Sequence, residues 1–171
     1  MAQSGYLDET TVKRLHDLAR SDAAWLPFAV ALETGLRIGD VLALQRVNVR
    51  DDRIDFIAAK TGKVGSAAIS AATASALRKS AGRSRWCFPS PSPRRMGKHL
   101  TRQAAWYRVK AACKRAGVEP QGVSPHSFRK TFAARALQQT HDVEVVRRLL
   151  QHDTLSDTCL YAFSDRLSGK R

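Results

Sequence analysis

Apolar positions recur at helical spacing through the first part of the chain. Asp8 is the predicted N-cap of a first helix that reaches about residue 20, with apolar positions three or four residues apart. Residues 25–33 are apolar on nearly every side, which predicts a buried helix that ends at Gly35. A third helix is predicted over residues 36–44.

The spacing then changes to alternation, which is typical of strands. Residues 53–58 and 64–69 alternate in this way and flank a tight turn. Together with residues 47–49 they predict a small three-stranded antiparallel sheet. The second hairpin of that sheet would carry Lys60 and Lys63 at its tip.

Helical spacing returns after residue 70. Further helices are predicted over residues 71–80, 101–116, 125–139, 142–150 and 155–164. The helix after Ser124 begins most clearly, because serine is a good N-cap and Pro125 suits the first helical position. A loop rich in proline and serine occupies residues 82–97. The pattern predicts a mixed α+β fold that is mainly α-helical.

Length and composition favour a single globular domain over residues 1–171. Hydrophobic residues make up 43% of the chain and charged residues 26%, as in folded proteins. No apolar run approaches the ~20 residues of a membrane span, and no signal peptide opens the chain. We therefore expect a cytoplasmic protein without a membrane partner. Cys87, Cys113 and Cys159 lack metal-ligand spacing, so neither a disulfide framework nor a metal site is expected.

The excess positive charge lies in one block in the middle of the chain. The formal net charge is +14, from 29 Lys+Arg and 15 Asp+Glu. Between Asp55 and Glu119 there are fourteen bases and no acid, which accounts for the whole excess. A solvated basic face is the ordinary explanation of a short charge run. A block of this length instead indicates a polyanionic partner, and nucleic acid is the usual one.

Tyr161 and the basic residues that precede it are the candidate catalytic set. The basic members are Arg37, Lys60, His126, Arg129 and His152. A phenol attacks well only where cations hold the electrophile and a base accepts its proton. A phosphodiester, whose negative charge grows during attack, suits such a set.

Several members of this set have ordinary structural alternatives when taken singly. Arg37 could pair with Asp40, Lys60 could be a solvated turn residue, and Tyr161 could pack its ring in a core. His126 and Arg129 are more informative, because both fall in the first turn of a helix whose N-terminus already favours an anion.

Four segments that contain these residues occur in a fixed order. They are Thr34-Gly35-Leu36-Arg37-Ile38-Gly39-Asp40, Lys60-Thr61-Gly62, Ser124-Pro125-His126-Ser127-Phe128-Arg129-Lys130-Thr131-Phe132-Ala133, and Leu149-Leu150-Gln151-His152 with Tyr161 nine residues on. They resemble the motifs of the tyrosine recombinases, the phage integrase family. The likeness runs from about residue 7 to residue 163, and four ordered motifs are far more specific than one. It implies the catalytic-domain fold of that family.

The chain departs from the family pattern in three respects. Gln151 stands where the family commonly has glycine before the second histidine, and only residues 162–171 follow Tyr161. Members usually carry an N-terminal core-binding domain, which is absent here. We therefore expect a catalytic-domain fragment or a naturally minimal protein.

The resemblance implies a site-specific recombinase that cleaves and rejoins DNA through a 3′-phosphotyrosyl intermediate. Tyr161 would be the nucleophile and would release a 5′-hydroxyl. Arg37 and Arg129 would hold the nonbridging oxygens in the transition state. The phosphotyrosine conserves the bond energy, so no cofactor, ATP or metal ion is expected.

The remaining residues of the set would handle protons. Lys60, on its hairpin, would protonate the departing 5′-oxygen, and His126 would accept the tyrosine proton. His152 would donate a hydrogen bond to the phosphate. Asp40 would support the site by orienting Arg37 or His126.

Double-stranded DNA is the expected partner, and we expect a homotetramer that assembles on DNA in a synaptic complex. Accessory DNA-bending proteins are further candidate partners, and the setting would be the nucleoid of a bacterium or phage host. The residues expected along the DNA are Lys63, Arg94, Arg95, Lys98 and Arg102. Three alternatives remain: type IB topoisomerase-like relaxation of DNA, a non-catalytic DNA-binding module of the same fold, and a basic structural or RNA-binding protein.

Overall fold

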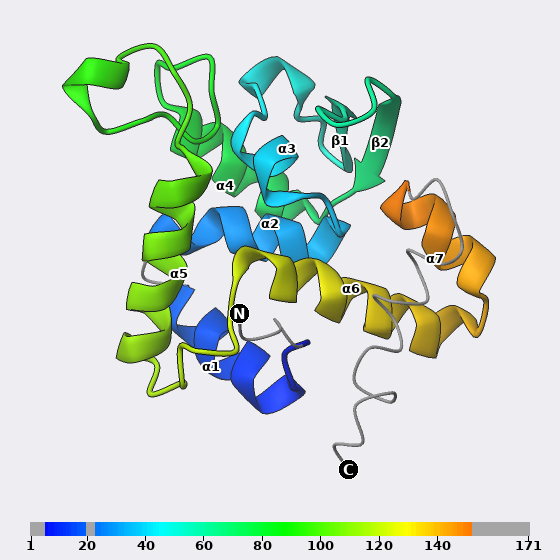
Figure 1. Cartoon of the computed structure of the whole chain (residues 1–171). Coiled ribbons are helices and arrows are strands. Elements are labelled where there is room, and N and C mark those ends of the chain that lie inside the picture. Colours follow the sequence, from blue (N-terminus) through cyan, green and yellow to red (C-terminus); the bar gives the residue numbers. More distant parts are fainter. Residues whose placement is uncertain (1–5, 20–22, 152–171) are drawn as a thin grey trace.

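The computed structural model describes residues 6–19 and 23–151 of the chain. This part is mainly helical with one small antiparallel sheet (Figure 1), which confirms the prediction of a mixed α+β, mainly α-helical fold. The elements in chain order are α1 (Glu9–Ala19), the 3₁₀ helix η1 (Ala23–Trp25), α2 (Leu26–Thr34), α3 (Ile38–Leu42), η2 (Arg46–Asn48), β1 (Arg53–Ile57), β2 (Val64–Ala68), α4 (Ala71–Ala81), η3 (Pro93–Arg95), α5 (Arg102–Arg115), α6 (Pro125–Thr140) and α7 (Val143–Leu150).

Several helices begin at the capping residues that the sequence predicts. Ser70 and Thr101 each accept a hydrogen bond from the N–H group three residues later, at the starts of α4 and α5. Ser124 accepts one from the N–H of His126 at 3.2 Å, and Pro125 is the first residue of α6. A cap involves only neighbouring residues, so the local sequence is enough to predict it.

Helix α2 lies across the centre of the molecule and packs along α6 (Figure 1). Its apolar character on nearly every side is explained by this position, because neighbouring elements cover it. Trp25, Phe28 and Phe128 form the aromatic centre of the core, with ring centroids 5.3–5.4 Å apart. This packing fixes the N-terminal half of α2 against the start of α6.

The sheet has two strands, so the prediction of three is wrong. Strands β1 and β2 pair in antiparallel register, with Arg53 opposite Ala68 and Ile57 opposite Val64. Residues 47–49 fall at η2, which is bent by the reciprocal hydrogen bonds of Gln45 and Asn48. Only one isolated bridge, between Val49 and Ile54, remains of the expected strand.

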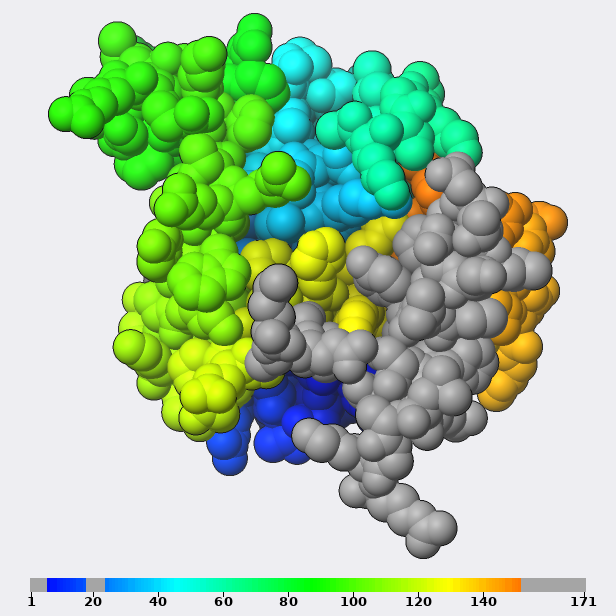
Figure 2. All heavy atoms as spheres, viewed as in Figure 1, coloured from blue at the N-terminus to red at the C-terminus, as the bar shows by residue number. Residues whose placement is uncertain are grey.

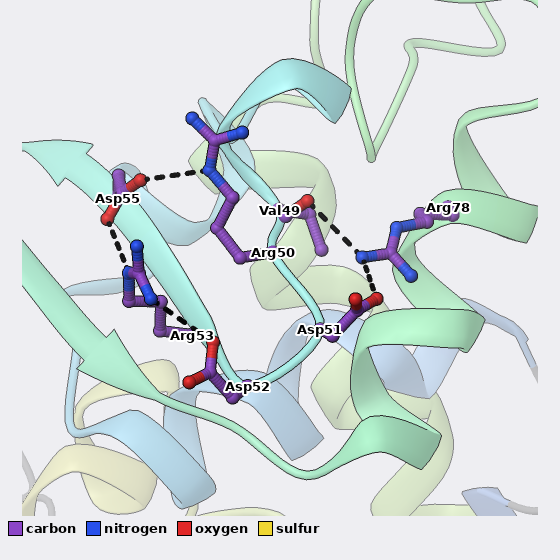
Figure 3. Close-up of polar contacts among 7 residues, drawn as sticks. All are labelled: Val49, Arg50, Asp51, Asp52, Arg53, Asp55 and Arg78. Carbon is purple, nitrogen blue, oxygen red and sulfur yellow. Dashed lines mark hydrogen bonds and ion pairs between the residues drawn. The ribbon is translucent and has the colours of Figure 1, made fainter.

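Charged side chains fasten the turn that follows this bridge (Figure 3). Asp51 accepts from Arg78 at 2.7 Å, and Asp55 pairs with Arg50 at 3.3 Å and with Arg53 at 3.5 Å. Exposed pairs of this kind stabilise a fold by less than about 1 kcal/mol each. They nevertheless show that Arg78, one base of the central block, already has an acidic partner.

The segment after α2 is more extended than the sequence predicts. A helix was expected over residues 36–44, whereas α3 spans only Ile38–Leu42 and Arg37 is its extended N-cap. The backbone after α3 instead forms hydrogen bonds with residues 85–87. Leu44 accepts from the N–H of Cys87 at 2.9 Å, and Arg46 donates to Arg85 at 2.8 Å.

The predicted loop over residues 82–97 contains the short helix η3 and projects from the body (Figures 1 and 2).

Among the helices of the described residues, none combines the length and the apolar character that a membrane span requires. Cys87 and Cys113 are buried and free, and burial raises the pKa of the Cys87 thiol to about 11. The predicted helix over 155–164 and Cys159 lie outside the described residues.

Candidate active site

Arg129 connects the start of one helix to the ends of two others. Its side chain is buried in the first turns of α6, with 3% of the residue exposed. Nη1 donates to the carbonyl of Gly35 and Nη2 to the carbonyl of Leu150, each at 2.6 Å. The guanidinium therefore ties the end of α2 and the end of α7 to the start of α6. These charge-assisted bonds place a fixed positive charge at the α6 N-terminus.

His126 stands on the surface of the same helix end. The pKa of its imidazole is lowered, first because protein atoms displace water around the ring, and further by the positive charges of Arg129, Lys130, Arg37 and Arg102. Both effects disfavour the protonated form. A neutral imidazole is what a proton acceptor requires, so the environment suits the role expected for His126.

Arg37 reaches this site from the turn between α2 and α3. It is half-buried, and its charge acts on His126 although the two residues are far apart in the sequence. Among the described residues, no hydrogen bond or ion pair occupies its guanidinium, so the alternative of an Arg37–Asp40 pair is wrong for this part of the chain.

Gly35 makes the close approach of this turn to α6 feasible. It adopts a left-handed conformation with φ +68°, and a Cβ placed on it would lie 2.4 Å from the ring of Phe132. Only glycine combines this backbone conformation with this contact. The Gly35 carbonyl is also the one that receives Arg129, so the turn and the arginine are fixed together.

We expect Gly35→Ala to destabilise the fold by about 2–5 kcal/mol, from backbone strain of roughly 1–2 kcal/mol and overpacking of about 1–3 kcal/mol. Gly62→Ala is the matched control, because Gly62 has the same φ of +68° but no described atom within 4 Å of the added Cβ. It should cost only about 1 kcal/mol. Urea unfolding of both variants measures the difference, and equal losses would show that the Phe132 contact carries no penalty.

The β1–β2 hairpin presents Lys60 as an exposed residue near its turn. The hairpin is attached to α3 through Asp40, whose Oδ1 accepts a hydrogen bond from the N–H of Ala59 at 2.9 Å. Asp40 is 6% exposed, so its carboxylate needs such a donor. The described contact of Asp40 is thus to the backbone beside Lys60, whereas the sequence led us to expect Arg37 or His126.

The residues predicted to contact DNA occupy three different places. Arg102, at the start of α5, lies beside Gly39 of α3, and its charge acts on His126, so it belongs to the site itself. Arg94, Arg95 and Lys98 are exposed on the projecting loop of η3. Lys63 is exposed at the hairpin turn. The space-filling view places the loop and the hairpin on either side of α3 (Figure 2).

Lys110 of α5 was not predicted to matter. Its Nζ donates to the carbonyl of Val123 at 2.7 Å and also to that of Pro120. These carbonyls belong to the loop that leads into α6, so Lys110 holds the segment preceding His126. Only the folded chain brings the two segments together, and a lysine within a basic helix carries no sequence signal of this role.

Gln151 was noted in the sequence only as a departure from the expected glycine. It caps α7 in a left-handed conformation with φ 51°, and its amide lies against Gly65 of β2. Its buried Oε1 has no hydrogen-bond partner among the described residues. Beside it is a groove of about 570 Å³ whose lining includes Glu33, Phe132, Arg135 and Leu149.

The two remaining candidates, His152 and Tyr161, lie outside the described residues.

Comparisons with known proteins agree on the family of this arrangement. The family model described as "Phage integrase family" matches residues 6–166. Tyrosine recombinase XerD of Haemophilus ducreyi is 39% identical over 69 residues, which is 40% of this chain and 23% of that protein. XerD of Shewanella oneidensis is 41% identical over 69 residues, with the same shares of the two chains covered. The matched segment is thus less than a quarter of the length of these relatives.

Solved structures show the same fold. XerA recombinase superposes with a TM-score of 0.77 at 23% identity and covers 99% of this chain and 66% of that one. A lambda integrase dimer bound to a core site gives 0.75 at 20% identity, covering 100% and 50%. The catalytic domain of bacteriophage HP1 integrase gives 0.64 at 24% identity, covering 94% and 88%. These likenesses concern the architecture.

Proposed function

This chain belongs to the phage integrase family, and on that premise we propose that it is the catalytic domain of a site-specific DNA recombinase. The observation that carries the proposal is the cluster at the start of α6. Arg129 is fixed there by two backbone carbonyls, and the charge of Arg37 reaches the imidazole of His126. Relatives with this fold are recombinases, some of them solved with DNA.

In the proposed reaction, the phosphodiester binds where the guanidinium groups and the α6 N-terminus can neutralise its charge. The Tyr161 oxygen attacks phosphorus while His126, neutral because of its lowered pKa, accepts the phenolic proton. Lys60 gives a proton to the 5′-oxygen as its bond to phosphorus breaks, and His152 donates a hydrogen bond to the phosphate. The products are a 3′-phosphotyrosyl bond and a free 5′-hydroxyl.

The reverse attack by a 5′-hydroxyl restores the phosphodiester, so bonds made and broken balance without ATP. Side-chain cations supply the charge stabilisation for which other phosphoryl-transfer sites use metal ions. We further propose double-stranded DNA as the substrate and a homotetramer assembled on DNA as the active form, with accessory DNA-bending proteins.

Trapping of the covalent intermediate tests this function. The probe is a pool of nicked duplexes of randomised sequence, labelled at the 5′ end, incubated with the chain in EDTA. Cleavage near the nick releases a short fragment, so the labelled strand stays attached to the protein. We expect a denaturant-resistant adduct whose labelled peptide contains Tyr161. An adduct that requires a divalent cation, or that maps to another residue, would overturn the proposal. Sequence-independent relaxation of supercoiled DNA would favour the topoisomerase-like alternative.

The projecting loop is proposed to contact DNA phosphates through Arg94, Arg95 and Lys98. Replacing Arg95 with glutamine should weaken binding to all sequences alike and reduce the slope of log affinity against log salt by about 1. Fluorescence anisotropy of a labelled duplex over a range of KCl concentrations measures this slope. Arg50→Gln removes the same charge from a residue paired with Asp55, so it is the matched control. A loss confined to one DNA sequence would contradict a phosphate contact.

A further inference from the structure

The side chain of Gln151 occupies the space that Gly65 leaves open. A Cβ built on Gly65 would lie 2.0 Å from Nε2 of Gln151 and 2.9 Å from Cζ of Phe56. Gly65 and Phe56 are opposite each other in the β1–β2 register. The amide of Gln151 is therefore seated on the hairpin, and any side chain at position 65 would displace it.

Gln151 has two local features that a glycine there would remove. Its backbone is left-handed, with φ 51° and ψ 43°, a conformation unfavourable for residues that have a Cβ. Its Oε1 is buried without a hydrogen-bond partner among the residues described. Local strain and unsatisfied polar atoms are found where the surrounding structure or the function requires them. The contact with Gly65 is the feature of Gln151 that a glycine could not supply.

This contact joins the part of the site that holds Arg129 to the hairpin that carries Lys60. On one side, Gln151 follows Leu150, whose carbonyl receives Nη2 of Arg129 at 2.6 Å. On the other side, Gly65 belongs to the hairpin that presents Lys60. The hairpin has a second attachment through Asp40 and Ala59. With both in place, the hairpin is held at its turn and along β2.

We propose that Gln151 is a positioning residue that acts through Lys60. Its side chain, seated on Gly65, sets the position of the β1–β2 hairpin relative to Arg129 and so determines where Lys60 meets the departing oxygen. This inference rests on the proposed function, in which Lys60 is the proton donor.

A double-mutant cycle with two leaving groups tests the inference. The variants are Gly65→Ala, Gln151→Gly and the combination of the two. Each is assayed in single turnovers on one duplex selected by covalent trapping, made either with the natural 5′-oxygen or with a 5′-bridging sulfur. A thiolate is a better leaving group than an alkoxide and departs without a proton donor. A defect in positioning Lys60 should therefore disappear with sulfur.

We expect Gly65→Ala to slow cleavage of the oxygen substrate by about tenfold or more, because the methyl group displaces the amide of Gln151. In the Gln151→Gly background the same substitution should cost less than about threefold, so the two changes are strongly non-additive. With the sulfur substrate all three variants should cleave within about threefold of the unmodified chain. Lys60→Ala should show the same dependence on the leaving group.

Additive effects, or an equal defect with oxygen and sulfur, would overturn the inference. If Gly65→Ala does not fold, Gln151→Gly alone decides, because the inference requires it to be slow with oxygen and normal with sulfur. Failure of the proposed function has a different signature, since the unmodified chain would then form no adduct at Tyr161.

Discussion

Tyr161→Phe is expected to abolish the covalent adduct and to reduce strand cleavage at least about 10⁴-fold, to the level of the assay background. The substitution removes one oxygen atom, the proposed nucleophile, and leaves the ring in place. The phosphate-binding charges of Arg37 and Arg129 are untouched, so affinity for the duplex should change by less than about threefold. Adduct formation on nicked DNA and anisotropy on intact DNA measure the two quantities separately.

Tyr107→Phe is the matched control for this prediction. Tyr107 lies on α5, is 60% exposed and contacts the edge of Trp106 through its ring, so the same exchange there removes an oxygen without a proposed chemical role. It should leave adduct formation unchanged. An adduct that persists in Tyr161→Phe would remove Tyr161 from the mechanism, and loss of the adduct in Tyr107→Phe would show that the assay reports something other than the nucleophile.

The second large effect is expected for Arg129→Lys, which should lower both the stability of the fold and the rate of DNA cleavage. In arginine, two separate nitrogens of the planar guanidinium donate to the carbonyls of Gly35 and Leu150. Lysine keeps the charge but has a single nitrogen, so it cannot make both hydrogen bonds in this geometry. An unsatisfied buried carbonyl and a poorly paired buried charge together cost about 2–4 kcal/mol. Cleavage should fall by about a hundred- to a thousandfold, because the positive charge no longer has a fixed position.

Arg135→Lys is the control on the same helix. Arg135 makes two hydrogen bonds to Glu9, at 2.8 and 2.6 Å, but Glu9 is largely exposed, so the substitution should cost less than about 1 kcal/mol. Urea unfolding and single-turnover cleavage are measured for both variants. Loss of activity in Arg129→Lys at unchanged stability would contradict the joint structural and catalytic role of Arg129.

The buried Arg129 gives the site a fixed positive charge, and the other described candidate residues around it are more exposed. His126 and Arg37 are more accessible than Arg129, and Lys60 is exposed on its hairpin. A transition state is stabilised best by charges that are already fixed before the reaction, because no reorganisation is then required. The arginine that ties α2, α6 and α7 together is therefore well placed to fix the geometry for the others.

Local signals explain which parts of the fold could be predicted from the sequence. Ser70, Thr101 and Ser124 cap helices by hydrogen bonds to residues two or three positions away, so their short-range patterns were sufficient. The third strand was mispredicted because residues 47–49 alternate as a strand does, whereas Gln45 and Asn48 bend the backbone. The helix over residues 36–44 was too long because Leu44 pairs with Cys87, a partner that no local pattern indicates.

The sequence by itself determined the starts of the capped helices and the order of four motifs, and through these motifs it indicated the family and nominated the candidate residues. These depend on neighbouring residues or on residue types, which the chain displays directly. The tertiary structure alone decided how the candidates meet. Arg129 bonds to carbonyls 94 and 21 residues away, and the amide of Gln151 fills the space above Gly65. Such contacts arise only when distant segments pack, because volume and hydrogen-bond geometry are then satisfied by partners that sequence spacing does not specify.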